Sequence, residues 1–562
     1  MTKLLKWWRA PFKAVEGEPC SNTYRLVNNL AEAGFNVGRF VGLKSLKGVG
    51  LQPGDFIIGV EDHYSERLVS DIGEEYGVDL KPLKTLDPES IATIRSPLIG
   101  VYSGEGAGPS YTQDIVEALE KMGFRKVSLL SGPLTPSDLS SLDALVFGGG
   151  DSFKILSSMK PDEAKLVRQF IESGGVYIGI CGGAMLPIKP VNILGAAYGG
   201  LEAWEELQIV ECEFLSDSVT EPPWPVFSGR KLGEVLRTYP IKGLVKSRVR
   251  KGLLTLGYTG KVTMLHAGPL IRATNPRQVF GIIELLVGRV EYGIPCEEAV
   301  EKAQGASSII MVEYGSGKIV LFTSHVESSE TPAAHGLLGN ALFLKTYGNN
   351  EKRFVQHVEE IKPEDFMAAS ESCRVLKLVK DAANKVVEQV ENVIPGLYAS
   401  QLVQEATQLS MLKQVISRIV ARESIILESM EETLKAMTVL QELRRKGFAN
   451  TQVGILSSSL AEWSYVVGKA RKALPPLLEK IVETQELMAD LSTIVVSSDR
   501  GDVERRFAAV WNTLMGGRAS LEKGVPASPG VVSPLASLLI NFTDSLEKTR
   551  LLRKILTYFK QS

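Results

Sequence analysis

Short apolar runs alternate with amphipathic helical patterns between residues 97 and 180. The apolar runs, which are typical of buried strands, are 97–102, 126–130, 144–147 and 176–180. The segments 111–122 and 161–173 between them carry apolar residues at helical spacing. Strands and helices that alternate in short units predict a parallel, doubly wound α/β sheet, which we assign to residues 96–350.

Different patterns flank this region on both sides. Residues 1–95 predict a small α/β unit with helices at 23–33 and 65–76, a strand that ends at Phe40 and a strand at 55–60. Residues 351–562 carry long segments of 3.6-residue period, at 369–393, 402–446, 457–496 and 534–560, the third of them interrupted by Pro475-Pro476. This pattern predicts an all-α bundle of about five or six helices.

The distribution of glycine supports the same division. Residues 1–350 hold 43 of the 52 glycines and residues 351–562 hold the other 9. Glycine supplies the positive-φ turns that connect strands to helices, so the glycine-rich part reads as α/β and the rest as helical. We therefore expect three domains, at 1–95, 96–350 and 351–562.

Charge and cysteine content narrow the classes of function. The chain has 63 Lys and Arg against 65 Asp and Glu, a formal net charge of −2, so we expect no nucleic-acid partner. Five scattered cysteines do not form a disulfide framework or a CxxC metal site, and we expect no bound metal. A reducing, cytoplasmic setting fits this content best.

The N-terminal segment is basic and contains Trp7 and Trp8. No long apolar core follows it, and no stretch of the chain reaches eighteen uninterrupted apolar residues, so we expect neither a secretory signal nor a transmembrane helix. We interpret the segment as an ordinary first helix with two packed or half-exposed tryptophans. A short interfacial membrane anchor is the alternative.

The most informative motif follows the strand predicted at 176–180. There the chain reads Gly179-Ile180-Cys181-Gly182-Gly183, a G-x-C-x-G sequence typical of a nucleophile on a sharp strand-to-helix turn. Flanking glycines remove the Cβ clashes that such a turn would create. We expect the following helix to favour the Cys181 thiolate with its N-terminus, and the backbone N–H of Gly182 to face a developing oxyanion.

A cysteine nucleophile needs a base, and the base needs a group that orients it. A late apolar strand, 318–324, runs into His325-Val326-Glu327. Side chains two apart in an extended chain project to the same side, so Glu327 is placed to hold the imidazole while His325 takes the thiol proton. His266, at the end of another predicted strand, is either a second residue of this pocket or a structural histidine.

Two glycine-rich loops complete the candidate site. The strand at 144–147 ends in Gly148-Gly149-Gly150, whose backbone we expect to approach a substrate, with Gly149 and Gly150 as oxyanion or substrate contacts. Residues 103–108 have G-x-G-x-G spacing, and no acidic residue follows the next strand, so we expect no dinucleotide cofactor. We interpret this loop as a pocket rim that brings Glu105 near the substrate.

These motifs resemble those of the class I glutamine amidotransferase-like superfamily. Its members share a strand–GxCxG–helix unit and a later strand that ends in H-x-E, and the closest similarity, over about residues 96–347, is to the domain named after the N-terminal part of biotin-protein ligase. The resemblance implies a flavodoxin-like fold with Cys181 as nucleophile, His325 as base and Glu327 as its orienting group. Glutamine-hydrolysing members usually carry glutamine where this chain has Met185, which cannot hydrogen-bond an amide.

Two functional hypotheses follow. In the first, the chain is a cysteine-dependent hydrolase or amidotransferase-like enzyme that cleaves a C–N bond of a small amide-type substrate. In the second, the pocket is catalytically degenerate, binds a ligand, and the helical domain docks a protein partner. Met185 favours the second hypothesis, as does the long insertion between Cys181 and His325, around residues 205–260. The helical region also carries an apolar seam, which either packs within the bundle or binds a partner, formed by Leu402, Ala406, Leu409, Leu412 and Val415.

Overall fold

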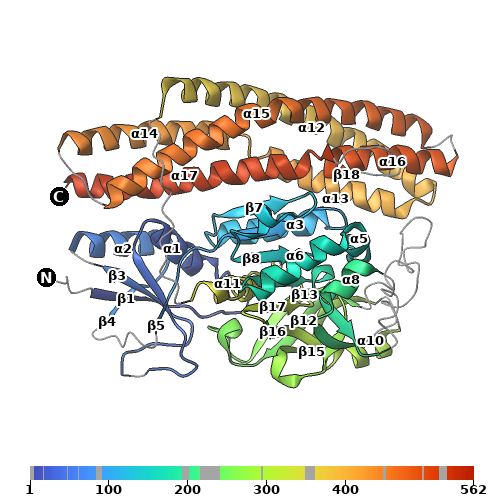
Figure 1. Cartoon of the computed structure of the whole chain (residues 1–562), viewed down its shortest axis with the longest axis horizontal. Helices are drawn as coiled ribbons and strands as arrows, with labels where there is room; N and C mark the ends of the chain where they lie inside the picture. The colour runs from blue at the N-terminus through green and yellow to red at the C-terminus, as the bar shows by residue number, and fades with distance from the viewer. Residues whose placement is uncertain are drawn as a thin grey trace. The chain divides into compact units, whose positions relative to one another are not determined.

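A computed structural model of the chain separates into two compact units (Figure 1). Described residues are 6–16, 18–46, 48–60, 63–83, 91–192, 201–215, 241–292, 295–347, 361–446, 451–495, 499–517 and 528–561. The first unit comprises nearly all residues up to Glu351, and the second consists mainly of Lys352–Ser562. Each unit is described by itself.

The first unit begins with a five-stranded antiparallel sheet in the order β4-β1-β3-β2-β5. Its strands are β1 (Lys6–Ala10), β2 (Asn36–Phe40), β3 (Phe56–Val60), β4 (Lys81–Leu83) and β5 (Ile91–Thr93), and its helices are α1 (Ser21–Glu32) and α2 (His63–Glu75). The expected N-terminal helix is wrong, because the tryptophan segment forms β1. Paired with β3 and β4, this segment satisfies its backbone hydrogen bonds and leaves Trp7 and Trp8 half-buried.

A nine-stranded sheet follows, and its parallel half confirms the predicted α/β class. The parallel strands are β6 (Ile99–Tyr102), β7 (Val127–Leu130), β8 (Ala144–Phe147), β9 (Val176–Ile180) and β17 (Gly317–Phe322), in the order β7-β6-β8-β9-β17. In chain order this is 2-1-3-4-5, the arrangement of flavodoxin-like doubly wound sheets. The loops after β6, β8 and β9 therefore meet at the carboxyl edge, beside the point where the strand order reverses.

Connecting helices cover this sheet. They are α3 (Pro109–Lys121), α4 (Pro136–Leu139), α5 (Ser152–Ser158), α6 (Pro161–Glu172), α7 (Gly182–Met185), α8 (Glu202–Leu207), α10 (Cys296–Ala303) and α11 (His335–Leu342). Of these, α6 packs against β17, and α11 packs against β9. The helices predicted at 111–122 and 161–173 are confirmed as α3 and α6.

The other half of the large sheet is antiparallel, so the sheet is mixed. It extends from β17 through β16 (Ser307–Tyr314), β15 (Val279–Tyr292), β12 (Ile241–Val249) and β13 (Lys261–His266). This half curls back on itself, because Leu265 at the far edge bridges His325, just beyond β17, with 2.7 Å between the His325 nitrogen and the Leu265 oxygen. Beside it lies a three-stranded sheet of β10 (Ile188–Pro190), β11 (Val210–Phe214) and β14 (Ile271–Ala273).

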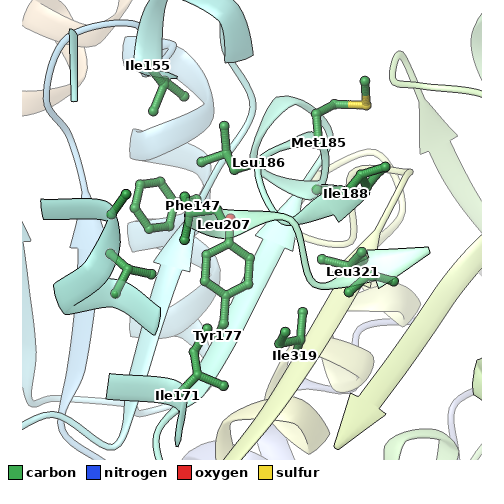
Figure 2. Packing of buried hydrophobic residues seen from close by; sticks show 14 of the residues in the cluster. Phe147, Ile155, Ile171, Tyr177, Met185, Leu186, Ile188, Leu207, Ile319 and Leu321 are labelled. Atoms are coloured by element: carbon green, nitrogen blue, oxygen red, sulfur yellow. The ribbon is translucent and has the colours of Figure 1, made fainter. Parts of the chain in front are cut away.

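One apolar cluster fills the space between β8, β9, β17 and the helices next to them (Figure 2). Phe147 and Tyr177 stack with ring centroids 5.4 Å apart, and both rings are nearly inaccessible to solvent. Leu321 of β17 and Met185 of α7 belong to the same cluster. Met185, the residue in place of a glutamine, is therefore a core residue directly beside the elbow.

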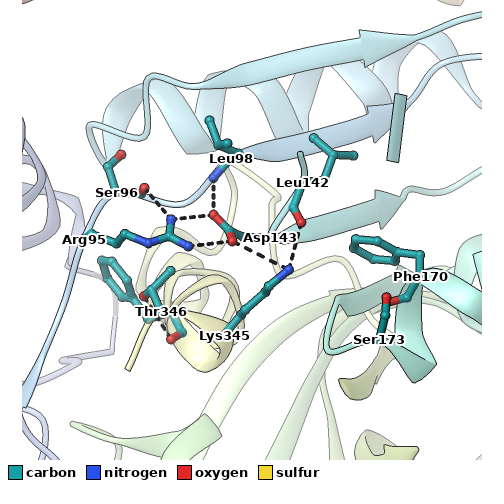
Figure 3. A network of polar contacts seen from close by, with 10 residues as sticks. Arg95, Ser96, Leu98, Leu142, Asp143, Phe170, Ser173, Lys345 and Thr346 are labelled. Carbon is teal, nitrogen blue, oxygen red and sulfur yellow. Dashed lines mark hydrogen bonds and ion pairs between the residues drawn. The ribbon is translucent and has the colours of Figure 1, made fainter. Parts of the chain in front are cut away.

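A polar network closes the opposite, amino edge of the parallel strands (Figure 3). Asp143, just before β8, is fully buried and accepts hydrogen bonds from Nη1 and Nη2 of Arg95, at 2.6 and 2.7 Å. It also accepts the backbone N–H of Leu98, just before β6, at 2.9 Å, and Lys345 lies 3.8 Å away. Burial alone would raise the pKa of Asp143, but the hydrogen bonds from Arg95 and Leu98 lower it below its ordinary value.

The second unit is helical, as predicted. Its helices are α12 (Pro363–Ala399), α13 (Val403–Val420), α14 (Ile425–Arg445), α15 (Thr451–Ile494), α16 (Arg500–Met515) and α17 (Val532–Gln561), with a short ribbon of β18 (Gly516–Gly517) and β19 (Ser528–Pro529). The seam from Leu402 to Val415 is buried, and α13 packs against α12 and α17.

The segment 402–446 contains two helices, since a turn at 421–424 separates α13 from α14. The interruption expected in the segment 457–496 is wrong. Pro475-Pro476 does not end α15, although each proline removes a helical hydrogen bond. Leu474, Leu477 and Ile481 on both sides of the prolines are buried, and this packing holds the helix together. No helix in the described part of the chain is long and apolar enough to cross a membrane.

Candidate active site

Cys181 lies at the end of β9 in a backbone conformation that non-glycine residues rarely adopt. Its φ is 53° and its ψ is −113°, and among the described residues only Gln401 is another non-glycine residue with positive φ. The backbone N–H of Cys181 donates to the oxygen of Phe322 in β17, at 2.9 Å, which ties the turn to the sheet. Strained backbone of this kind persists where the surroundings enforce it and is concentrated at functional sites.

The glycines of the G-x-C-x-G motif permit close backbone packing around Cys181. A Cβ at Gly182 would lie 2.4 Å from the Gly150 oxygen, and one at Gly183 would lie 2.0 Å from the Phe147 oxygen. A Cβ at Gly179 would lie 2.5 Å from the Gly183 oxygen. A side chain at Gly182 or Gly183 would push the turn away from β8 and the loop after it, and one at Gly179 would push β9 away from α7.

His325 and Glu327 form a buried pair beyond the end of β17. Nδ1 of His325 lies 2.7 Å from Oε1 of Glu327, and both side chains are at most 2% exposed. Burial alone would lower the pKa of His325, but the Glu327 carboxylate and the nearby Cys181 thiol raise it well above the ordinary value. Nε2 of His325, the nitrogen turned away from Glu327, is buried without a hydrogen bond.

The thiol is held by a loop from the antiparallel half of the sheet. Sγ of Cys181 donates to the carbonyl oxygen of Ala267, at 3.1 Å, and the Cys181 residue is 1% exposed. The next residue, Gly268, lies so close that a Cβ there would be 3.4 Å from the Cys181 Cα. The curled edge strand β13 therefore brings this loop onto the elbow.

Two aromatic side chains surround the pair. Tyr111 of α3 stacks on the imidazole of His325, with ring centroids 4.6 Å apart and an interplanar angle of 25°. His266 is fully buried, and its Nδ1 lies 3.0 Å from the hydroxyl of Ser324. Burial, and then the charge of His325, lowers the pKa of His266 to about 3, so its ring is neutral at physiological pH.

The loop after β8 lies directly against these groups. A Cβ at Gly149 would be 2.9 Å from Cε1 of His325, and Gly150 has a φ of 154° and bridges Ala107 in the loop after β6. Gly182 is the first residue of α7, so its N–H has no partner within that helix. Because α7 has only four residues, the expected helix-dipole contribution to the thiolate is small.

Glu105 lies at the rim rather than among the buried groups. Its side chain is 38% exposed and pairs with Lys154 at 3.7 Å. The structure thus brings Cys181, His325, Glu327, Gly149, Gly150 and Gly182 together at one edge. Sequence reasoning missed Tyr111, Ser324 and the Ala267 carbonyl. For Tyr111 the signal available was its place at the start of a helix that follows a glycine-rich loop.

Within the described ranges, no group of three or more His, Cys, Asp or Glu side chains is arranged to hold a metal ion. The other cysteines there are unpaired, and burial raises the pKa of Cys20 to about 11 and that of Cys212 to about 12. What the arrangement offers is a thiol, an imidazole oriented by a carboxylate, and backbone N–H groups.

The family model described as Peptidase family S51 matches residues 103–205, which include the loops after β6, β8 and β9. Sequence comparison with curated proteins gives no match. Among solved structures, a putative GMP synthase protein from Thermoplasma acidophilum is 14% identical, with 44% of this chain and 92% of that chain covered and a TM-score of 0.25.

Two further solved structures are similar over larger parts of the chain. A beta-galactosidase from Bacillus circulans sp. alkalophilus is 15% identical, with 50% of this chain and 35% of that chain covered and a TM-score of 0.26. A two-domain protein from Anabaena variabilis, with DJ-1/ThiJ/PfpI-like and ferritin-like domains, is 11% identical, with 77% and 98% covered and a TM-score of 0.19. The strand order and the match to Peptidase family S51 fit a class I glutamine amidotransferase-like fold.

Proposed function

We propose that the protein is a cysteine-dependent hydrolase that cleaves a C–N bond of a small amide or peptide. The observation that carries this proposal is the strained Cys181 turn beside the buried His325–Glu327 pair. An ordinary, unstrained turn would serve the packing equally well. The strained turn instead presents a nucleophile at the carboxyl edge of the sheet, where the loops meet.

The chemistry follows from the groups present. The raised pKa of His325 favours transfer of the Cys181 thiol proton to its Nε2, which leaves a thiolate beside an imidazolium, and Sγ then attacks the carbonyl carbon of the amide. As the C–N bond breaks, His325 returns the proton to the leaving amine and a thioester remains on Cys181. Water then attacks the thioester with His325 as base, which releases a carboxylic acid and restores the thiol. Glu327 keeps the imidazole oriented and stabilises its protonated form.

The oxyanion of each tetrahedral intermediate needs donors that are already in place. We assign this role to the backbone N–H groups of Gly150 and Gly182. Their loops are in direct contact, since a Cβ at Gly182 would meet the Gly150 oxygen. The thiol hydrogen, which is donated to the Ala267 carbonyl at 3.1 Å, has to turn toward His325 before it is transferred.

The second candidate is a degenerate site that binds a ligand without turnover, in a protein whose helical unit docks a partner. The observation that favours it is the burial of the site, since the Cys181 residue is 1% exposed and Met185 packs into the core. In this case the Cys181 thiol would keep its bond to Ala267 and would not react.

Thiol labelling separates the two candidates. The background variant carries Cys296→Ser and Cys373→Ser, because Cys296 is exposed and Cys373 half-buried. The protein is treated with iodoacetamide at pH 7, and the modified cysteine is identified by peptide mass. We expect Cys181 to react at least about 100-fold faster than Cys20 and Cys212, whose thiols are held neutral by burial.

The substrate arm uses a mixture of amides and short peptides, with intact-mass detection of an acyl adduct. The adduct is expected in wild type and in a variant with Glu327→Asp, and not with Cys181→Ala. Equal, slow labelling of Cys181, Cys20 and Cys212, together with no adduct from any amide, would rule out catalysis and leave the ligand-binding candidate.

A further inference from the structure

A groove with three arginines lies between the large sheet and the three-stranded sheet of the first unit, apart from the Cys181 site. Its volume is about 560 Å³. The arginines are Arg248 and Arg250 at the end of β12 and Arg272 of β14. Its floor is apolar, with Val249, Ala273, Val279, Phe280 and Ile282, and Thr274 and Ser307 add hydroxyl groups.

The walls of the groove are fixed relative to each other. The backbone N–H of Ala273 in β14 donates to the hydroxyl of Ser307 in β16, at 3.2 Å, which joins the three-stranded sheet to the large sheet. Arg250 directly follows β12, and its backbone N–H donates to the Phe280 oxygen of β15 at 2.9 Å, so the extended chain continues and Arg248 and Arg250 project to the same side. The fold therefore fixes the shape of the groove, with Arg248 and Arg250 on the β12 side and Arg272 on the β14 side.

Cationic charge exceeds acidic charge around the groove. Glu284 lies 2.8 Å from Arg248 and is shared with Lys261, at 2.7 Å. Arg272 pairs with Glu213 at 3.2 Å. Two carboxylates therefore face four cations once Arg250 is included.

Arg250 is the cation held ready for a ligand. Its guanidinium lies 4.3 Å from the ring centroid of Phe280 and donates one hydrogen bond to the oxygen of Arg277, at 2.6 Å. These contacts orient the guanidinium plane without neutralising its charge, and most of its five N–H donors stay available. An oriented guanidinium that has no carboxylate partner among the described residues matches the two-pronged geometry of an oxyanion.

We propose that this groove binds a small molecule that carries a phosphate or carboxylate group. Arg250 and Arg272 hold the oxyanion, and the apolar floor at Phe280 and Val279 receives the body of the ligand. The size of the groove fits a metabolite, since small-molecule sites are commonly about 300–1,000 Å³. Its lining residues are different from those of the Cys181 site, so it is a second site.

The test is calorimetric titration of the full chain at low ionic strength with three probes: inorganic phosphate, pyrophosphate and citrate. We expect pyrophosphate or citrate to bind, and Arg250→Met to weaken binding at least tenfold, since charge-assisted hydrogen bonds contribute about 1.5–3 kcal/mol. Comparing the affinities for phosphate and pyrophosphate with the affinity for citrate shows whether the groove prefers a phosphate or a carboxylate group. Arg272→Met is expected to act in the same direction as Arg250→Met.

The matched control is Arg289→Met, which removes the same charge from an exposed position further along β15. Binding that falls equally in all three variants, or no binding of any probe by a folded wild type, overturns the proposal. Tight binding of a single-stranded oligonucleotide in place of the three probes also overturns it. Arg250→Lys keeps the charge but not the planar fork, so an affinity between those of wild type and Arg250→Met supports the proposed geometry.

Discussion

Nδ1 of His325 lies 2.7 Å from Oε1 of Glu327, and neither side chain is accessible to solvent. Removing two charges from water is costly unless they are paired, so the pair has to be held by its surroundings. This support comes from the Tyr111 ring, which stacks on the imidazole, and from the hydrogen bond that the backbone N–H of His325 donates to the Leu265 oxygen. Because Nδ1 is bound to Glu327, Nε2 is the nitrogen of His325 that exchanges a proton with Cys181.

Replacing Glu327 by glutamine should slow iodoacetamide labelling of Cys181 by about 100-fold. Glutamine keeps the shape of the side chain but lacks the charge that stabilises the imidazolium and can also fix the wrong tautomer. Labelling rates are measured by peptide mass in the Cys296→Ser, Cys373→Ser background. Glu330→Gln, an exposed change three residues away, should leave the rate unchanged, and an unchanged rate with Glu327→Gln would remove the orienting role.

The two buried histidines of the candidate site should have pKa values shifted in opposite directions. His325 has a raised pKa, so it stays protonated above pH 6.5, and the stability that this gives is complete below pH 6.5 and is lost as the pH rises through its folded pKa. His266 has a pKa lowered to about 3, so it stays neutral and destabilises the fold as the pH falls from 6.5 to 3, by about 1.4 kcal/mol per pH unit.

Nuclear magnetic resonance of protein labelled at histidine rings measures this directly. The His266→Asn and His325→Asn variants assign the signals, and Glu327→Gln should move the His325 transition to lower pH. Titration of both rings near pH 6.5 would mean that the histidines are exposed to solvent, contrary to their burial here.

The Gly183→Ala variant should lose about 2–4 kcal/mol of unfolding free energy. The added Cβ would lie 2.0 Å from the Phe147 oxygen, and backbone atoms on both sides cannot move without opening the elbow. Gly132→Ala is the control, because nothing lies within 4 Å of a Cβ there, and it should change stability by less than about 0.5 kcal/mol. Thermal unfolding midpoints compare the two, and similar midpoints would contradict close packing at the elbow.

Much of the fold was predictable because its periodicity is local. The strands β6, β8 and β9 and the helices α3 and α6 lie within one or two residues of their predicted ends. The N-terminal segment was not, because Trp7 and Trp8 suit either a helix or a strand, and only pairing with β3 and β4 decides between them. The long helix through Pro475-Pro476 depends likewise on packing that local propensity does not describe.

The candidate site also has a part that was predictable from the sequence and a part that was not. Cys181 and the H-x-E motif are encoded by short patterns, and the glycines around them follow from the turn they permit. The Ala267 carbonyl belongs to a loop 86 residues further along the chain, and it reaches the thiol only because the antiparallel half of the sheet curls back to His325. Such long-range closure leaves no local signal in the sequence.

Asp143→Asn should weaken the amino edge of the parallel sheet at neutral pH. The change leaves Arg95 next to a neutral amide in a buried position, and breaking one partner of a buried ion pair costs about 3–5 kcal/mol. Asp162→Asn is the matched control, since the Asp162 side chain is 92% exposed. Hydrogen exchange of peptides that cover β6 and β8 should rise in the first variant and stay unchanged in the second.

Low pH should remove the difference in hydrogen exchange between wild type and Asp143→Asn. The folded pKa of Asp143 is lowered, so its contribution to stability is complete above the unfolded value near 3.8 and is lost as the pH falls through the folded value. The gap in exchange between wild type and Asp143→Asn should therefore be constant from pH 7 to about pH 5 and narrow only below about pH 4. A gap that closes near pH 6 would mean that a histidine, not Asp143, controls this edge.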